Sequence, residues 1–512
     1  MRERQPHEAR RTDPKGFIIR ALTMLAQLVI PLGVAMFTIL DDGDVSGKLA
    51  WAAPFIAALI LFNLAAAYLQ WTKLTYTVGE SDIRVESGVL SRAARAVPYE
   101  RIQDVSLEQK LLPRLFGLVE VKFETGAGGK DDLSLTYLSE AEGERLREVV
   151  RNRRDAPDGV IAEESGEPAP PEEAEVIFAM GPQRIFTFGL FEFSLAVVAV
   201  IGGLAQQLDF LLPFELWDVD EWEQRLAGPG QWLAGLGVFA QVAGILIAIA
   251  MLTALGVLTG IVRTALREWD FRLERTSKGL RRRRGLLTRT DLVMPLHRVQ
   301  ALRLNTGFIR RHFGWHSLKI ISLASDSGGA NHDAVPFGQM EEIEPVVATT
   351  DFHLPPATTE WERAERRYRF DKAVLASLVL VPATIITAIF AIDWIWLAPA
   401  IGLLFTLGEQ YWRWRHDFRA LGADQLYSRH GWFNPSLAIA SRTKLQSVEI
   451  LQGPIARARG YASLYLGLAG GRLRVHGMPI AEARRWQKAL ADSMAQCDFS
   501  KMLEQSVPPV ES

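Results

Sequence analysis

Arg101-Ile102-Gln103-Asp104-Val105 is the first of three copies of a pattern that decides how this chain folds. Arg298-Val299-Gln300-Ala301-Leu302 and Lys444-Leu445-Gln446-Ser447-Val448 repeat its order: a basic residue, an aliphatic residue, glutamine, a small or polar residue, and a second aliphatic residue. In each copy a glycine lies 15 residues before the glutamine and another lies 14 residues after it. Three collinear copies with one internal spacing indicate a duplicated domain. The repeat-defining residues are Gly88, Gln103, Gly117, Gly285, Gln300, Gly314, Gly431, Gln446 and Gly460.

These repeat-defining residues are expected to be structural. We predict that the glycines occupy turns with a positive φ, which glycine adopts without steric cost. We predict that the three glutamines lie on equivalent strands and hydrogen-bond a loop backbone inside each module. The alternative role for the glutamines is a ligand contact shared by the three modules.

Length and composition indicate several domains with segregated apolar and charged parts. A chain of 512 residues is too long for one ordinary core. It is 48% hydrophobic and 23% charged, and long uncharged apolar runs alternate with strongly charged stretches. The net charge of -2 therefore says little about partners. The single cysteine, Cys497, excludes an intramolecular disulfide and a cysteine-rich metal cluster.

Six apolar stretches are long enough to cross a bilayer, which takes about 20 residues of helix. Helices are expected because lipid cannot satisfy stray backbone groups. The stretches form three hairpins, of which the third is the least regular because Asp393 leaves almost no loop between two short halves. The stretches lie near 17–40, 50–70, 185–207, 231–262, 373–391 and 393–411.

Basic residues near the helix ends predict the orientation. The N-terminal segment is basic, and so are the exits of the second, fourth and sixth stretches, which carry Lys73, Arg267 and Arg415. The loops of the first two hairpins are mostly acidic instead. The positive-inside rule therefore places both termini and all three modules in the cytoplasm.

Each hairpin is followed by a β-rich module. In the first module, Ile83-Arg84-Val85-Glu86 and Val119-Glu120-Val121-Lys122-Phe123 alternate between apolar and polar residues. This period of two, with turn residues at short intervals, predicts a small sandwich or barrel. Ser139-Glu140-Ala141-Glu142 is a capping-box sequence that predicts a helix at the end of the module. The third module ends in the same way after Ile480, whereas Pro345 cuts the weaker helical pattern of the second.

This arrangement resembles the bacterial pleckstrin-homology-like membrane proteins of the YdbT type, long classed as a domain of unknown function. The resemblance rests on the paired helices, the Arg-Ile-Gln-Asp-Val-like strands and the turns at Gly88-Val89-Leu90, Gly285-Leu286-Leu287 and Gly431-Trp432-Phe433. It implies an α+β membrane protein in which three transmembrane helical hairpins are each followed by a cytoplasmic pleckstrin-homology-like (PH-like) β-sandwich or barrel with a C-terminal helix. The family has no established catalytic residues, so none is carried over.

The third module departs from the pattern of the other two. Arg459-Gly460 lacks the phenylalanine that precedes the glycine elsewhere, and Ser441 replaces the proline found at Pro98 and Pro295. A surface role kept by the first two modules is therefore in doubt for the third.

The expected division of the chain follows the repeat. The segments are 1–70, the cytoplasmic N-terminus and first hairpin; 71–153, the first module; 154–184, an acidic disordered linker; 185–267, the second hairpin; 268–350, the second module; 351–370, a linker; 371–411, the third hairpin; 412–500, the third module; and 501–512, the C-terminal tail.

The sharpest charge run is Arg281-Arg282-Arg283-Arg284. Together with Arg310 and Arg311 it is a candidate surface for anionic lipid headgroups or for a partner protein, since a basic residue near an anionic leaflet contributes about 1 kcal/mol. The alternative is a solvated strand end that obeys the positive-inside bias. The expected partners are membrane lipids and a smaller two-helix membrane protein with a single PH-like module. Nucleic acid is not expected, because no stacking aromatics interleave with the run.

No catalytic, cofactor or metal site is expected. The chain has no GxSxG, no P-loop and no GxGxxG sequence. His312 and His316 have the spacing of a helical metal pair, but Gly314 between them disfavours a helix. We interpret the chain as a multi-pass scaffold or interaction protein of the bacterial inner membrane. The alternative is a component of a transport or export system for a small solute or toxic peptide, for which Asp393 and Glu409 are the ionisable candidates.

Overall fold

The computed structural model describes residues 9–41, 45–88, 93–125, 133–155, 174–194, 237–277, 279–322, 331–390, 397–469 and 471–496, with Gln224 and Gly228. The chain divides into two compact units. The larger unit comprises 1–178, 273–282 and 290–512, and the smaller comprises 179–272 and 283–289.

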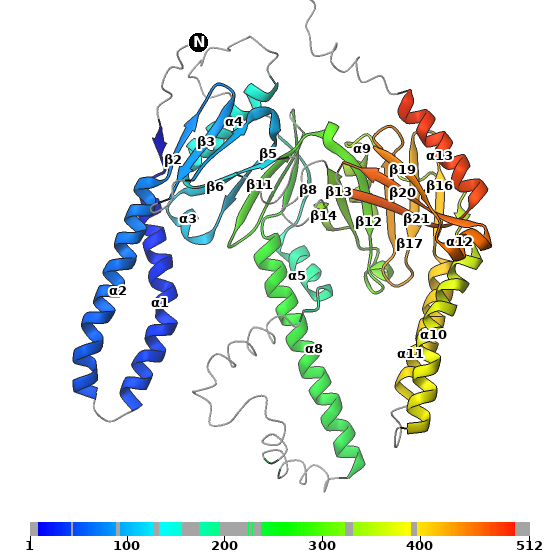
Figure 1. Ribbon diagram of the computed structural model, residues 1–512, viewed down its shortest axis with the longest axis horizontal. Coiled ribbons are helices and arrows are strands. Elements are labelled where there is room, and N and C mark those ends of the chain that lie inside the picture. The colour runs from blue at the N-terminus through cyan, green and yellow to red at the C-terminus, as the bar shows by residue number, and fades with distance from the viewer. Residues whose placement is uncertain are drawn as a thin grey trace, which may run out of the picture. The chain divides into compact units, whose positions relative to one another are not determined.

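Two pairs of long helices lie side by side, as the apolar stretches predict for the first and third hairpins. In the larger unit α1 (Lys15–Asp41) lies beside α2 (Val45–Lys73), and α10 (Arg366–Phe390) lies beside α11 (Leu397–Arg415), as Figure 1 shows. In the smaller unit α5 (Pro182–Phe191) packs on α8 (Val238–Glu268). Most of the predicted stretch 185–207 lies outside the described residues.

Three of the described helices meet the requirements of a membrane span. These segments are 53–73, 241–268 and 366–390, and they are long and apolar enough to cross a bilayer. In α8, the consecutive residues Ile245, Leu246 and Ile247 are 60–61% exposed although they point in different directions around the helix. A helix that is apolar on all sides and packs against so little protein is stable only in lipid. The chain is therefore an α+β membrane protein.

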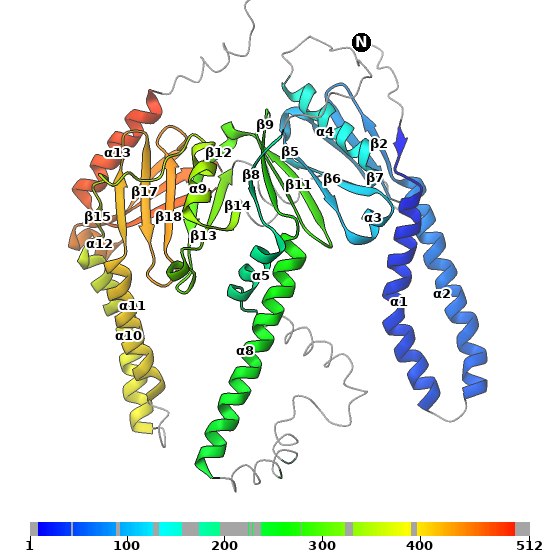
Figure 2. The same ribbon diagram turned by 180° about the vertical axis from the view of Figure 1, so that it is seen from behind.

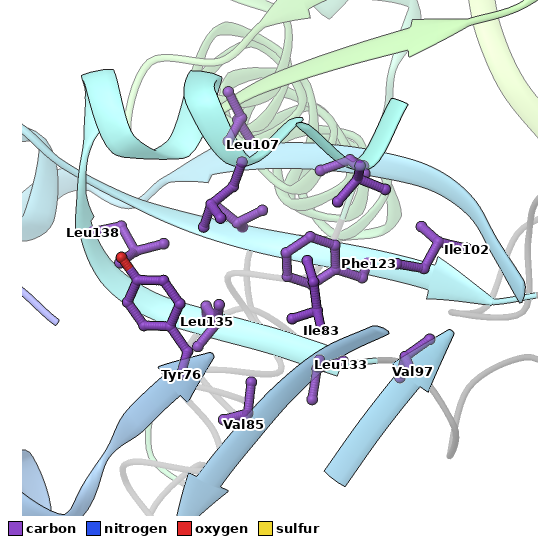
Figure 3. Packing of buried hydrophobic residues seen from close by; sticks show 14 of the residues in the cluster. Tyr76, Ile83, Val85, Val97, Ile102, Leu107, Phe123, Leu133, Leu135 and Leu138 are labelled. Carbon is purple, nitrogen blue, oxygen red and sulfur yellow. The ribbon is translucent and has the colours of Figure 1, made fainter. Parts of the chain in front are cut away.

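The first module is a β-sandwich. One sheet contains β1 (Arg10–Arg11), β2 (Thr75–Val78), β3 (Asp82–Ser87) and β4 (Ala93–Pro98). The facing layer contains β5 (Ile102–Gln109), β6 (Leu118–Thr125) and β7 (Leu133–Ser139), with the short helix η1 (Tyr99–Arg101) before β5 and α3 (Leu111–Leu115) before β6. Ile83 and Val85 from the first layer meet Phe123 and Leu135 from the second in a buried core, shown in Figure 3. The C-terminal helix α4 (Glu140–Asp155) contributes Leu146 and Val150 to this core.

The other modules repeat this plan. The second contains β8 (Glu175–Ala179), β9 (Arg272–Thr276), β10 (Gly279–Arg284), β11 (Arg289–Met294), η3 (Leu296–Arg298), β12 (Val299–Asn305), η4 (Arg310–Phe313), β13 (His316–Ser322), β14 (Asn331–Gly338) and α9 (Met340–Ala348). The third contains β15 (Glu362–Arg363), β16 (Phe418–Leu421), β17 (Gln425–His430), β18 (Ser436–Ser441), β19 (Ser447–Leu451), α12 (Pro454–Arg459), β20 (Tyr461–Leu468), β21 (Gly471–Pro479) and α13 (Ile480–Ala495). Pro345 lies inside α9 and does not end it.

The six repeat glycines all have the predicted positive φ. The values are 111° at Gly88, 112° at Gly285, 87° at Gly431, 70° at Gly117, 71° at Gly314 and 77° at Gly460. Gly88 and Gly431 follow β3 and β17, and the two hairpins share one register, since Asp82 pairs with Pro98 and Gln425 pairs with Ser441. The repeat alignment is therefore correct at these turns.

The prediction that the three glutamines lie on equivalent strands is wrong in one copy. Gln103 and Gln300 lie at the second position of β5 and β12, where the pairing with the next strand is interrupted by a bulge. Gln446 lies one residue before β19, outside the strand, and its backbone N–H binds the carbonyl oxygen of Gly467 at 2.8 Å. The buried Gln300 Nε2 donates to the carbonyl oxygen of Arg298 at 3.4 Å, which is a contact within its own module.

Two features of the repeat were not predicted. First, each unit starts with a strand before its helical hairpin: β1 pairs with β2, and β15 pairs with β16. Second, neighbouring modules share sheets. The strand orders are β7-β6-β5-β11-β10-β9-β8 and β14-β13-β12-β18-β17-β16-β15, so a layer of one module continues into a layer of the next. Figure 2 shows β12, β18 and β17 in this succession.

The strands before the second and third hairpins lie in segments that the sequence predicted to be linkers. The segment 154–184 was expected to be disordered, but it contains β8 and the start of α5. The segment 351–370 contains β15 and the start of α10. The strand pattern in these pieces is only two to five residues long, which is too short to stand out from an acidic, proline-rich background. Residues 156–173 of the first linker lie outside the described residues.

Candidate functional site

The junction between the first and second modules contains a cluster of two arginines and two carboxylates. Asp291 on β11 accepts from Arg281 on β10 at 2.6 Å and lies 3.3 Å from Arg147 on α4. Glu144, also on α4, lies 3.1 Å from Arg147 and 3.4 Å from Arg281. The cluster therefore connects the C-terminal helix of the first module to the strands of the second.

Burial makes this cluster significant for stability. The side chains of Arg147 and Asp291 are 10% and 15% exposed. Burial lowers the pKa of Arg281, but the hydrogen bond and charge of Asp291 outweigh it and raise that pKa above its ordinary value. Paired charges of this kind are costly to break, because the partner that remains is left in a poor solvent.

The junction between the second and third modules combines sheet pairing with aromatic contacts. In β12 and β18, Leu302 pairs with Ile439 and Arg303 pairs with Ala438. The rings of Phe308 and Phe433 are stacked with centroids 5.3 Å apart. Ala301 of the second module also belongs to the buried core of the third.

Two further contacts tie the backbone of these modules together. Arg311 Nη1 donates to the carbonyl oxygen of Trp432 at 2.9 Å, and its guanidinium lies 4.6 Å from the centre of the Phe308 ring. Lys444 Nζ donates to the carbonyl oxygen of Val299 at 2.8 Å. The basic residue of the third repeat pattern therefore binds the backbone of the second.

The arginine run has structural partners. Arg281 belongs to the junction cluster, and Arg282 Nη1 donates to the carbonyl oxygen of Asp333 at 3.3 Å. Within the smaller unit, Arg284 lies 2.9 Å from the buried carboxylate of Glu268 at the end of α8. Arg310 lies over the Phe337 ring at 5.8 Å. Lipid contact by this run stays a prediction, but its side chains are half-buried and take part in contacts that hold the fold together.

A basic and aromatic cleft lies at the end of the third hairpin, where the sequence analysis named only Arg415. It has a volume of about 540 Å³ and is lined by residues of α10, α11 and the strand before them. Four of the lining residues are arginines, Arg363, Arg366, Arg369 and Arg415, and no carboxylate lines the cleft. The remaining lining residues are Phe370, Ala373, Leu407, Gln410, Tyr411 and Trp414.

Trp414 organises this cleft. Its indole N–H donates to the carbonyl oxygen of Ala364 at 3.0 Å, just after β15. Arg363 and Arg366 lie over its ring at 5.0 and 4.7 Å. Stacking on an aromatic face holds a guanidinium in place while its N–H groups stay available. The density of arginines at 363, 366, 367 and 369, next to an apolar run, is the sequence signal that could have located the site.

Two buried polar atoms of the cleft have no hydrogen-bond partner among the described residues, Arg369 Nε and Gln410 Oε1. Arg369 uses its other end to bind Asp417 at 2.7 Å. Rotation of the Gln410 amide would present its NH₂ group in place of the oxygen. An anion in the cleft would satisfy both residues. The surroundings therefore suit a phosphate group attached to an apolar chain, as in an anionic phospholipid.

Short helices with exposed apolar residues lie near the hairpins. α3 packs beside α1 and carries Leu115, which is 73% exposed. α12 packs beside α10 and carries Ile455, which is 51% exposed. Basic residues accompany them at Arg114 and Arg457. Exposed apolar side chains next to bases at the end of a hairpin are typical of contact with the bilayer surface.

The remaining candidates lie in ordinary structural positions. His312 is in η4 and His316 starts β13, so the two are not on one helix. Glu409 on α11 forms an ion pair with Arg413 at 2.6 Å, one turn along the helix. Asp393 lies outside the described residues.

Comparison with known proteins agrees with the repeat. The model of the bacterial PH domain family matches residues 25–154, 230–349 and 373–494, which together exceed half of the chain. Each matched segment contains hairpin helix as well as module. The UPF0699 transmembrane protein YdbT of Bacillus subtilis (strain 168) is 22% identical over 465 residues, which cover 87% of this chain and 90% of that protein.

Proposed function

The chain belongs to the bacterial PH domain family, and from this premise we propose that it is a non-enzymatic membrane scaffold whose three modules act as one platform and which holds anionic phospholipid headgroups at its third hairpin. The observation that carries the scaffold proposal is the sharing of sheets between modules. Modules on flexible linkers would move independently, whereas strands paired across a junction fix the distance and orientation of the surfaces they present.

Splitting the chain tests the platform. Residues 1–155 and 174–512, produced as two polypeptides in one cell and extracted in mild detergent, should co-purify in equal amounts because β5 and β11 and the Asp291 cluster join them. Asp291→Arg should abolish co-purification, since it places a third base among two arginines. Glu148→Arg makes the same charge change on the exposed face of α4 and should leave it intact. Fragments that separate without any substitution would contradict the platform.

The cleft supports the lipid part of the proposal. Lipid retention is measured by native mass spectrometry of the full chain released from membranes that contain anionic and neutral phospholipids. Arg366→Gln removes a base that lines the cleft, whereas Arg367→Gln removes its neighbour, which is 63% exposed and does not line the cleft. Retention of anionic lipid should fall about tenfold in the first variant and change little in the second. Equal retention in both variants would mean that arginines here act only through the positive-inside bias.

We also propose that both termini and all three modules lie in the cytoplasm and that the membrane is the bacterial inner membrane. The basic residues at Lys73, Arg267 and Arg415, each in the last turn of its helix, support this orientation. Reporter fusions after Arg154, after Thr350 and at the C-terminus should all report the cytoplasm. A periplasmic signal from any one of them would overturn the topology.

A further inference from the structure

Among the described residues, two sheet edges at the ends of the module series have no neighbouring strand, although the same edges are covered inside the series. At each internal junction, the first strand of a three-stranded layer pairs with the last strand of the next module's four-stranded layer: β5 with β11, and β12 with β18. The first module's own β4 and the third module's own β19 end their sheets, with no further strand beside them in the described part of the chain. The described part of the chain therefore carries one open edge of each kind.

The exposure of these strands differs as expected. Residues Ala93 to Ala96 of β4 are all exposed, whereas Ser436, Ala438 and Ile439 at the equivalent places in β18 are buried. In β19, Glu449 and Leu451 are exposed, whereas the equivalent Arg303 and Asn305 of β12 are half-buried. Strands with open N–H and C=O groups are templates for pairing with another chain.

The repeat predicts the register of such a pairing. Counted from its glycine, Ala438 of β18 corresponds to Arg95 of β4; counted from the motif glutamine, Arg303 of β12 corresponds to Glu449 of β19. The pairing with the following strand supports this alignment, since Ala301 faces Ile321 and Ser447 faces Gly467, each seven residues after the equivalent glycine. The observed pair Arg303 and Ala438 therefore becomes Glu449 and Arg95.

This register puts opposite charges face to face. Glu449 is the one charged residue of β19, and Arg95 is the one charged residue of β4. The flanking pairs would be Val448 with Ala96 and Ile450 with Ala94, in which a small side chain meets a branched one. Directly opposed charges of unlike sign stabilise an antiparallel pair, and small residues allow close approach.

We propose that β19 of one copy pairs antiparallel with β4 of a second copy, so that copies associate head to tail and continue the sheet from chain to chain. A second copy is the occupant because the chain itself supplies both complementary edges, in the register that the junction of β12 with β18 uses. Both copies are held in one membrane by their hairpins, which raises their effective concentration. The interface is heterologous, because the two surfaces differ.

Cysteine cross-linking in isolated membranes tests the pairing. In a Cys497→Ser background, Glu449→Cys and Arg95→Cys are placed on separate copies that differ in size through a tag, and both are expressed in one cell. Opposed residues in antiparallel strands lie within disulfide distance. Oxidation should yield the mixed dimer. The positive control is Arg303→Cys with Ala438→Cys in one chain. In the negative control, Arg474→Cys on β21 takes the place of Glu449→Cys, because β21 and its equivalents β7 and β14 all end their sheets and none pairs with another module in the described part of the chain.

Each other outcome overturns the proposal. Dimers from Glu449→Cys alone mean that β19 pairs with itself. A disulfide that forms only when both cysteines are on one chain means that the edges close within a copy. No disulfide at all, with the positive control intact, means that another occupant covers the edges, such as a different membrane protein with one PH-like module.

Single charges on edge strands can also protect a sheet against unwanted association. Exchanging the charges of Glu449 and Arg95 distinguishes this protective role from a role in pairing. Cross-linking through a neighbouring pair, Ile450→Cys with Ala94→Cys on separate copies, reports the interface while the charges are changed. Glu449→Arg on the first copy should lower its yield several-fold, and Arg95→Glu on the second should restore it. A protective role predicts that neither change lowers the yield.

Discussion

At the scale of the residue, the repeat glycines have one backbone requirement but different surroundings. Gly431 and Gly460 have φ of 87° and 77°. A Cβ added at Gly431 would lie 2.5 Å from the carbonyl oxygen of Asn434, whereas one at Gly460 would meet nothing within 4 Å. The two glycine positions of one repeat therefore tolerate a side chain very differently.

Alanine substitution tests this difference. Gly460→Ala should lower the free energy of unfolding by about 1 kcal/mol, which is the cost of a left-handed conformation for a residue with a Cβ. Gly431→Ala adds a clash with backbone that cannot move freely and should cost clearly more. Thermal unfolding of the full chain in detergent measures both. A Gly460→Ala variant that is the less stable of the two would contradict the account.

A carboxyl pair in the third module predicts a pH dependence. The hydrogen bond with Glu482, then burial and the charge of Glu482, raise the pKa of Glu362 on β15 to about 7, against the opposing effect of Arg419. A raised pKa means that the folded state holds the proton more tightly than the unfolded state. Its stabilising contribution is therefore complete below about 4.5 and is lost as the pH rises through 7.

Neutralising this carboxyl should remove the dependence. Glu362→Gln is expected to raise Tm at pH 8 and to change it little at pH 5. Glu360→Gln, an exposed position two residues earlier, is the matched control and should change Tm at neither pH. If Glu362→Gln lowers Tm at pH 8, the ion pair with Arg419 outweighs the repulsion and the pKa assignment is wrong.

Patterns at the level of the residue predicted the conformation of the turns but not the ion-pair partners of the charged side chains. The spacing of Gly88 and Gly431 predicted their positive φ because turn geometry is local. The sequence offered the arginine run as a candidate lipid or partner surface but did not indicate its ion pairs, because Asp291 and Glu144 are 10 and 137 residues away from Arg281 and no local pattern indicates contacts of that kind.

At the scale of the element, the strand before the first hairpin and the strand before the third are each held by a tryptophan at the end of that hairpin. Trp71 donates its indole N–H to the carbonyl oxygen of Thr12 at 3.3 Å, and Trp414 does the same to Ala364. Thr12 follows β1 and Ala364 follows β15. These two tryptophans therefore hold a short strand across the base of the helices.

Loss of this hydrogen bond should loosen the strand. Trp71→Phe keeps the aromatic ring but removes the donor, at a cost of about 1 kcal/mol. Faster amide hydrogen exchange is expected at residues 10–12, with the rest of the first module unchanged. Trp269→Phe is the control, because this tryptophan is 40% exposed, and it should leave amide exchange at residues 10–12 unchanged. Unchanged exchange at 10–12 would mean that sheet pairing with β2 alone holds β1.

At the scale of the whole molecule, sequence periodicity predicted three equivalent modules with paired helices but treated them as separate. Alternation within a strand such as Ser447–Leu451 indicates its two faces but carries no signal of the strand beside it. The pairing of β12 with β18 joins residues more than 130 positions apart, so it follows from tertiary structure and not from local pattern. The cleft of the third hairpin could not be predicted from the sequence for the same reason, because it forms only when Arg363 and Trp414 come together in the folded chain.

The claim that the modules form one platform rests most directly on the pair Arg303 and Ala438. In a Cys497→Ser background, the full chain with Arg303→Cys and Ala438→Cys should form an intrachain disulfide in isolated membranes, detected as a mobility shift at the monomer position. Arg303→Cys with Ser436→Cys shifts the register by two residues, beyond disulfide distance, and should stay reduced. Formation of the first disulfide alone confirms the shared sheet; failure of the first, or equal formation of both, would contradict it.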